Sequence, residues 1–165
     1  MSDGGATKFQ FRLDAPVVSA LTALAQRYGY EVTAYMQKVL VNHAIESGLM
    51  EPAEESRASK TQEVIEAFIS LSQQLYAEGR FDEHFQRTVF LAAMEDATLR
   101  SNYEIAVGGP AFESGLPGKT PLNMYLGWYI KNAIGVDAQT RDGKPVRTSI
   151  RNAPIQSYTL LQERL

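Results

Sequence analysis

The sequence contains no cysteine, one tryptophan and two histidines among its 165 residues. Without cysteine the chain cannot form a disulfide, a thiolate metal site or a thiol nucleophile. No apolar run approaches the roughly 18 residues of a membrane span. The first residues, MSDGGATKFQ, have neither the apolar core nor the cleavage site of a signal peptide. We therefore expect a cytoplasmic protein that does not enter a membrane.

Residues for catalysis are also scarce. His43 and His84 fall in different predicted helices, and neither has the spacing of a metal ligand or a general base. The LPGKT sequence at 116–120 carries Glu113 where a phosphate-binding P-loop requires glycine. We expect no catalytic residues, no metal and no cofactor, and a nucleotide-binding enzyme is the weakest of the alternatives.

Basic residues are not in excess, because the net charge is −3. A composition of 44% hydrophobic and 21% charged residues is typical of a globular protein. The charge is uneven: residues 1–50 carry four basic and four acidic side chains, residues 51–100 carry five and ten, and residues 101–165 carry seven and five. The two ends are therefore the places to look for an anionic partner.

A short segment near the N-terminus, KFQFRLDAP at 8–16, alternates polar and apolar side chains. Lys8, Gln10 and Arg12 fall on one face of an extended strand, and the apolar residues between them fall on the other. A single short strand needs a partner, because even a complete two-stranded hairpin is marginal in water. No second strand pattern lies near it, so the pairing strand must come from elsewhere.

Two helices are predicted to follow this strand. Asp14 and Pro16 form a helix-start signal, and an apolar stripe continues until Gly29. The second helix begins at about Thr33 and ends at Gly48. Its apolar residues cover too wide an arc for one surface stripe, which predicts burial on two sides and a partner chain.

With this order of strand, capped helix, glycine turn and broadly apolar helix, residues 7–49 resemble the ribbon-helix-helix family, typified by the Arc and methionine repressors. In that family one strand from each of two chains pairs into an antiparallel ribbon, and the four helices form the dimer core. The ribbon enters the major groove of DNA. The resemblance implies that the partner of the N-terminal strand is its own copy in a homodimer.

The same resemblance implies which residues contact DNA. It makes Lys8, Gln10 and Arg12 the base readers, and it assigns a DNA phosphate to the backbone N–H groups at Thr33 and Ala34. The chemistry is suitable, since arginine pairs with guanine, glutamine with adenine, and lysine with guanine or a phosphate. The alternative for an amphipathic strand is an ordinary sheet edge whose outer side chains contact only water.

The remainder of the chain is predicted to form a second, mostly helical domain. Residues 51–60 are polar and aperiodic and are interpreted as a linker, which places the domains at 1–50 and 61–165. Apolar periodicity predicts helices over about residues 60–78, 82–100 and 120–135.

Charged side chains gather in two parts of this second domain. Its first two helices have acidic outer faces, which are typical of solvation and also of a surface for a partner protein. Asp142-Gly143, between two short polar runs, predicts a β-hairpin. Basic residues cluster on that hairpin and are candidates for a second DNA contact; a solvated hairpin or an assembly contact is the alternative. The acidic residues are Glu63, Glu66, Glu78, Glu83, Glu95 and Asp96, and the basic ones are Arg141, Lys144, Arg147 and Arg151.

The sequence therefore predicts a mainly α protein with a short β-ribbon, whose N-terminal module binds double-stranded DNA as a homodimer. We expect sequence-specific binding and transcriptional repression, with the C-terminal domain available for higher oligomers. Two alternatives stay open. One is a phage or plasmid factor that marks DNA for partition, transfer or packaging, and the other is an antitoxin-like protein whose C-terminal domain binds a partner protein.

Overall fold

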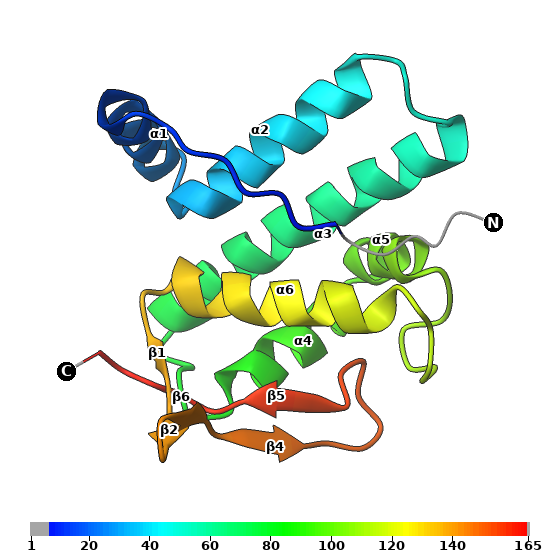
Figure 1. Cartoon of the computed structure of the whole chain (residues 1–165). Coiled ribbons are helices and arrows are strands. Elements are labelled where there is room, and N and C mark those ends of the chain that lie inside the picture. The colour runs from blue at the N-terminus through cyan, green and yellow to red at the C-terminus, as the bar shows by residue number, and fades with distance from the viewer. Residues whose placement is uncertain (1–6, 165) are drawn as a thin grey trace.

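The computed structural model describes residues 7–164, which form six helices and six short strands in that range. The chain is mainly helical, as predicted, with small β-hairpins at its C-terminal end (Figure 1). The helices are α1 (Ala15–Arg27), α2 (Val32–Glu46), α3 (Pro52–Ala77), α4 (Phe85–Glu95), α5 (Ala97–Val107) and α6 (Lys119–Ala133). The strands are β1 (Asp137–Ala138), β2 (Thr140–Arg141), β3 (Lys144–Pro145), β4 (Arg147–Ser149), β5 (Ser157–Thr159) and β6 (Leu161–Gln162).

The hydrophobic core lies around α3, which is 26 residues long. The buried face of this helix packs against α4, α5 and α6. Phe68 lies fully buried in the core, with its ring edge-on to the ring of Phe90 at 4.9 Å between centroids. In Figure 1, α6 lies between α2 and the C-terminal hairpins, so one helix borders both ends of the molecule.

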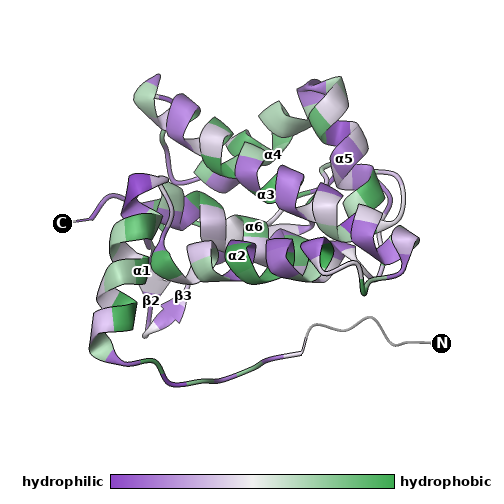
Figure 2. Ribbon diagram, turned by 90° about the horizontal axis from the view of Figure 1, so that it is seen from above, coloured by the Kyte–Doolittle hydropathy of each residue, from purple (hydrophilic) through white to green (hydrophobic). Residues whose placement is uncertain are grey.

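The predicted N-terminal strand does not form within the single chain. Residues 7–14 are neither helix nor strand, and all of them are exposed. Figure 2 shows this segment running outside the helical body. A strand needs a hydrogen-bonded neighbour, and the described part of one chain supplies none for this segment. The two helices predicted after it are confirmed as α1 and α2.

The predicted linker at 51–60 is helical instead. Helix α3 begins at Pro52, where a proline in the first turn, followed by two glutamates, favours a helix start. The Nε–H of Arg57 donates to the carbonyl oxygen of Ala106 in α5 at 3.1 Å. This polar segment therefore packs on the C-terminal helices, and its polarity reflects a mostly exposed helix rather than an irregular connection. The division into separate domains stays a prediction.

The helix predicted over 82–100 is in fact two helices, α4 and α5. The chain turns between them at Asp96, whose backbone is extended with φ −82° and ψ 113°. The carboxylate of Asp96 accepts a hydrogen bond from the backbone N–H of Leu99 at 2.8 Å and caps α5. The apolar periodicity alone predicts one longer helix, because it does not show that Asp96 caps a new helix.

The predicted hairpin at Asp142-Gly143 is confirmed. Both residues have positive φ, 52° and 74°, as a two-residue type I′ turn requires, and they join β2 to β3. Two further antiparallel pairs form in this region, β1 with β6 and β4 with β5. No helix of the described residues is long and apolar enough to span a bilayer.

The central position of Phe68 gives a first prediction. Phe68→Ala should lower the free energy of unfolding by about 3 to 5 kcal/mol, because it leaves a cavity against Phe90 in a closed core. Ser70→Ala changes an exposed position of the same helix and should stay within about 0.5 kcal/mol. Urea denaturation measures both, and an equal, small loss for the two variants would contradict this description of the core.

Candidate nucleic-acid interface

The three predicted base readers, Lys8, Gln10 and Arg12, all lie in the exposed segment that precedes α1. The segment enters α1 through Asp14, whose extended backbone precedes the first helical turn. Pro16 follows in that turn. In the structure of one chain, the three side chains therefore lie at alternate positions of one exposed segment.

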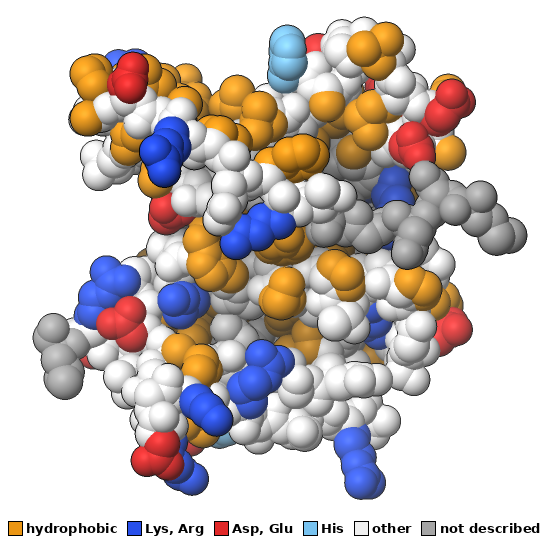
Figure 3. All heavy atoms as spheres, in the orientation of Figure 1, with side chains coloured by type: hydrophobic (Ala, Val, Ile, Leu, Met, Phe, Trp, Pro, Cys, Tyr) orange, Lys and Arg blue, Asp and Glu red, His pale blue; other side chains and the backbone are white. Residues whose placement is uncertain are grey.

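Apolar side chains on the same segment are also exposed. Phe9 is 79% exposed, Phe11 57% and Leu13 39%. The exposed apolar surface continues onto α1 through Val17 and Val18. Figure 3 shows hydrophobic side chains gathered over the part of the molecule formed by α1 and α2. Several large apolar side chains exposed on one part of a molecule are typical of an interaction surface.

The start of α2, predicted to hold a DNA phosphate, is capped by an acidic side chain. Glu31 accepts hydrogen bonds from the backbone N–H of Thr33 at 2.8 Å and of Ala34 at 3.2 Å. The hydroxyl of Thr33 also donates to this carboxylate, at 3.3 Å. The two predicted phosphate donors are thus occupied within the chain, and a phosphate must displace Glu31 to reach them.

Sequence reasoning missed this role of Glu31. Glutamate is not among the preferred capping residues, which directed attention to Thr33 instead. A usable signal was nevertheless present, because an acidic residue just before a helix interacts favourably with the positive end of the helix dipole.

Two polar contacts hold α2 on the rest of the protein. Lys38 forms an ion pair with Glu66 of α3, at 2.8 Å between Nζ and Oε1, and donates to the hydroxyl of Tyr30 at 3.3 Å. Burial acts to lower the pKa of Lys38, but its hydrogen bonds to Glu66 and Tyr30 outweigh this and raise the pKa. Burial raises the pKa of Tyr30, so both partners keep their protons. This link fixes the position of α2 on α3.

The second contact joins α2 to α6. The hydroxyl of Tyr129 donates to the side-chain oxygen of Gln37 at 3.0 Å. Burial raises the pKa of Tyr129 to about 12, so this hydroxyl stays protonated and remains a donor. The orientation of α2 is therefore set by both α3 and α6.

The four basic residues predicted as a second DNA contact lie on the C-terminal hairpins. Arg141 and Lys144 are exposed and directly opposite each other in the β2–β3 pair. Arg147 is on β4 and donates to the hydroxyl of Ser157 at 2.9 Å, while Arg151 is exposed in the β4–β5 loop. In Figure 1 these hairpins lie on the far side of α6 from α1 and α2. Within one chain the two candidate contacts are thus well separated.

The acidic residues of the C-terminal part are largely engaged within the chain. Glu63 accepts from Lys60 at 2.9 Å and from Asn102 at 3.0 Å. Glu66 pairs with Lys38 and Asp96 caps α5. These contacts give the acidic side chains a structural role, and a surface for a partner protein stays a prediction.

The lysine of the LPGKT sequence is also occupied. Lys119, the first residue of α6, is buried, and its ammonium group donates to the carbonyl oxygens of Ala111 and Glu113 in the preceding loop. Burial lowers the pKa of Lys119. Within residues 7–164 there is no cluster of three histidine, aspartate or glutamate side chains that could hold a metal ion.

The cap on α2 leads to a second prediction. Glu31→Gln keeps an oxygen that can cap the helix but removes its negative charge. If Thr33 and Ala34 hold a phosphate, this change should tighten DNA binding by about two- to fivefold per half-site. Glu46→Gln removes a charge from the opposite end of α2 and is the matched control. Fluorescence anisotropy with a DNA duplex measures both, and equal affinities for the two variants would separate the α2 start from phosphate binding.

No family model matches this chain, and no curated protein or solved structure matches it either. Its function must therefore be inferred from its own residues.

Proposed function

We propose that this protein is a homodimeric, sequence-specific DNA-binding protein. The N-terminal segments of two copies pair as an antiparallel ribbon, as in the ribbon-helix-helix family, and the ribbon reads the major groove. One observation carries the proposal: among residues 7–50, only Ala25 and Ala34 are buried within the single chain. Helix α2 contacts α3 and α6 of its own chain, but large apolar side chains before and within α1, Phe9 and Val17 among them, stay exposed, and a partner chain would bury them.

Dimerisation supplies the missing burial. Complete burial of a large apolar side chain contributes about 1.5 to 3 kcal/mol. Phe9, Phe11 and Leu13 lie on one face of the paired strand and would pack against the helices of both copies. Exposed residues of α2, such as Val39 and Leu40, widen the apolar surface available to the second copy. The gain repeats in both chains and offsets the loss of conformational freedom when the segment is ordered.

The same pairing turns the polar face of the ribbon outward. A two-stranded ribbon fits the major groove, and arginine and glutamine can each make a bidentate contact with a base. With Lys8, Gln10 and Arg12 from each chain, the dimer presents six reading side chains over two half-sites. Charge balance in the first 50 residues favours binding through these specific contacts rather than through general attraction to DNA.

We assign this binding to transcriptional repression through occupation of an operator. A DNA-marking role in partition, transfer or packaging would use the same ribbon and differs in where the preferred sites lie. Sequencing of the DNA bound in cells distinguishes the two roles. Sites at promoters support repression, and a single site near an origin or a packaging start supports marking.

The dimer gives a third prediction. Phe11→Asp places an unpaired charge in the proposed dimer core, which costs several kcal/mol, and should dissociate the dimer or unfold its N-terminal part. Gln10→Asp introduces the same charge on the outer face and should leave the dimer intact. Light scattering gives the mass of each variant. Because Phe11 is exposed in the single chain, a stable dimer after Phe11→Asp would exclude the proposed ribbon.

The reading face gives a fourth prediction. Gln10→Ala and Arg12→Ala should each weaken binding to the selected site by about 1 to 3 kcal/mol per contact, while binding to a scrambled duplex changes far less. Arg27→Ala removes an exposed charge at the end of α1 and is the matched control.

The site is first obtained by selection from a random duplex library, and circular dichroism confirms that each variant is folded. Should both alanine variants keep the full preference of the unmodified protein for the selected site, the exposed face does not read DNA.

A further inference from the structure

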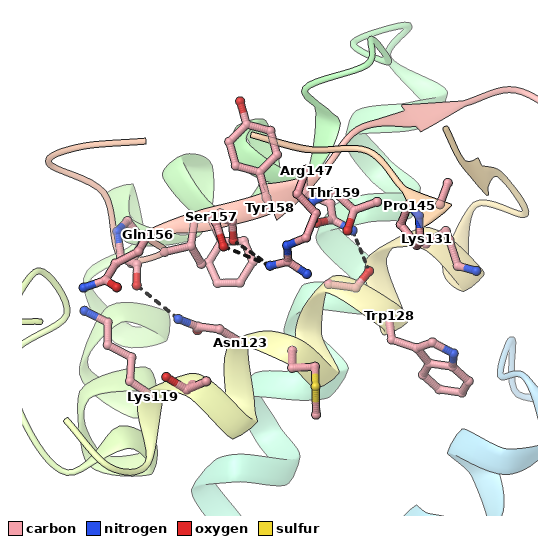
Figure 4. A pocket seen from close by; sticks show the side chains of 18 of the residues that line it. Lys119, Asn123, Trp128, Lys131, Pro145, Arg147, Gln156, Ser157, Tyr158 and Thr159 are labelled. Carbon is pink, nitrogen blue, oxygen red and sulfur yellow. Dashed lines mark hydrogen bonds between the residues drawn. The ribbon is translucent and has the colours of Figure 1, made fainter. Parts of the chain in front are cut away.

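A pocket of about 630 Å³ lies between α6 and the β4–β5 pair. Its volume is within the range of about 300 to 1,000 Å³ that is typical of small-molecule sites. Figure 4 shows side chains from α6 and from the β4–β5 region facing this space. The pocket lies in the C-terminal part of the chain, and no residue of the proposed DNA-reading ribbon lines it.

The charge of the pocket is strongly one-sided. Three basic residues line it, Lys119 and Lys131 from α6 and Arg147 from β4, and none of the residues that line it is acidic. None of the three forms an ion pair with a carboxylate among residues 7–164. Lys119 donates to the carbonyl oxygens of Ala111 and Glu113. Lys131 and Arg147 therefore supply the positive charge that favours an anionic ligand in a chain with net charge −3.

Arg147 is held in position for such a ligand. Its Nη2 donates to the hydroxyl of Ser157 at 2.9 Å, across the β4–β5 pair. Figure 4 shows its guanidinium group extending from the strands toward α6. A guanidinium group fixed in this way can use its other N–H groups for bidentate contacts with phosphate.

Hydrogen bonds across the pocket keep its walls together without a ligand. Gln86 donates to the carbonyl oxygen of Gly127 in α6 at 2.9 Å and accepts from the backbone N–H of Thr159 in β5 at 3.2 Å. Asn123 of α6 donates to the carbonyl oxygen of Pro154 at 3.1 Å. The strands and the helix are thus tied to one another on both sides, so little order has to be gained on binding.

The rest of the lining is mixed and includes large apolar side chains. Met124 is 65% exposed, and Leu116 and Trp128 also line the pocket. Such side chains bind an apolar or flat group, while the basic side chains bind the charge. The two cations Lys131 and Arg147 exceed the charge of one carboxylate, and a phosphate dianion balances them better.

We propose that this pocket binds a small organic molecule that carries a phosphate group. Arg147 holds the phosphate, Lys131 balances its charge, and the organic part packs against Met124 and Trp128. The site does not depend on DNA binding and is present in a single chain.

Trp128 makes the proposal directly measurable, because it is the only tryptophan of the sequence. Adenosine 5′-monophosphate is titrated into the full-length protein while tryptophan emission is recorded, with adenosine as the uncharged counterpart and sodium phosphate as competitor. We expect a saturable change with the monophosphate, reversal by sodium phosphate, and no saturable change with adenosine. Loss of a charged hydrogen-bonding group should weaken binding about tenfold or more in Arg147→Gln.

Arg141→Gln is the matched control, since Arg141 is exposed on β2 and does not line the pocket. Lys131→Gln, from α6, serves as the second variant should Arg147→Gln fail a circular dichroism test of folding. Three results would overturn the proposal: no saturable change with the monophosphate, equal binding of adenosine, or equal weakening by the Arg141 and Arg147 changes. A random-sequence DNA duplex that displaces the monophosphate from wild type, but does not bind Arg147→Gln, would assign the pocket to the DNA backbone instead.

Discussion

Burial of one face of α3 is the interaction on which the remaining structure depends. Helices α4, α5 and α6 pack on that face, and α2 contacts the same helix through the ion pair between Lys38 and Glu66. The hairpins are joined to this assembly by Gln86, which bridges α6 and β5, and by the hydrogen bond between His84 and the hydroxyl of Tyr158. The core is thus built mostly from residues after 50, and Ala34 of α2 joins it from the N-terminal part.

The difference in burial between the parts of the chain before and after residue 50 bears on the proposed function. Most of the buried side chains lie after residue 50, so the proposed dimer does not require the N-terminal segment to be paired before a second copy is present. Under this proposal the exposed phenylalanines of the segment drive association, and the same event orders its outer polar face. In the proposed dimer, recognition residues on a segment that folds only on pairing would be presented correctly only after assembly, which would link DNA reading to dimer formation.

Local signals in the sequence predicted much of the secondary structure. Asp142-Gly143 specified its hairpin because both positions need positive φ, and Pro16 marked the start of α1. The sequence predicts a linker at 51–60 rather than a helix, because an exposed helix and a linker are both rich in polar residues. The cap by Glu31 and the pocket were missed for different reasons. The first depends on side-chain geometry, and the second combines residues from Gln86 to Thr159 that only the tertiary structure brings together.

Because α3 is one continuous helix, it limits which changes in chain length the fold can accept. Each residue of an α-helix turns its end by about 100° and advances it by about 1.5 Å. One residue inserted between Pro52 and the buried face of α3 would therefore swing the N-terminal helices around the axis and break the contacts of Lys38 and Gln37. An insertion of seven residues restores the direction to within about 20°. We thus expect natural length changes in this stretch to come in steps of near-whole turns, because the helical phase of α3 sets how the N-terminal helices are oriented relative to the helices packed on its buried face.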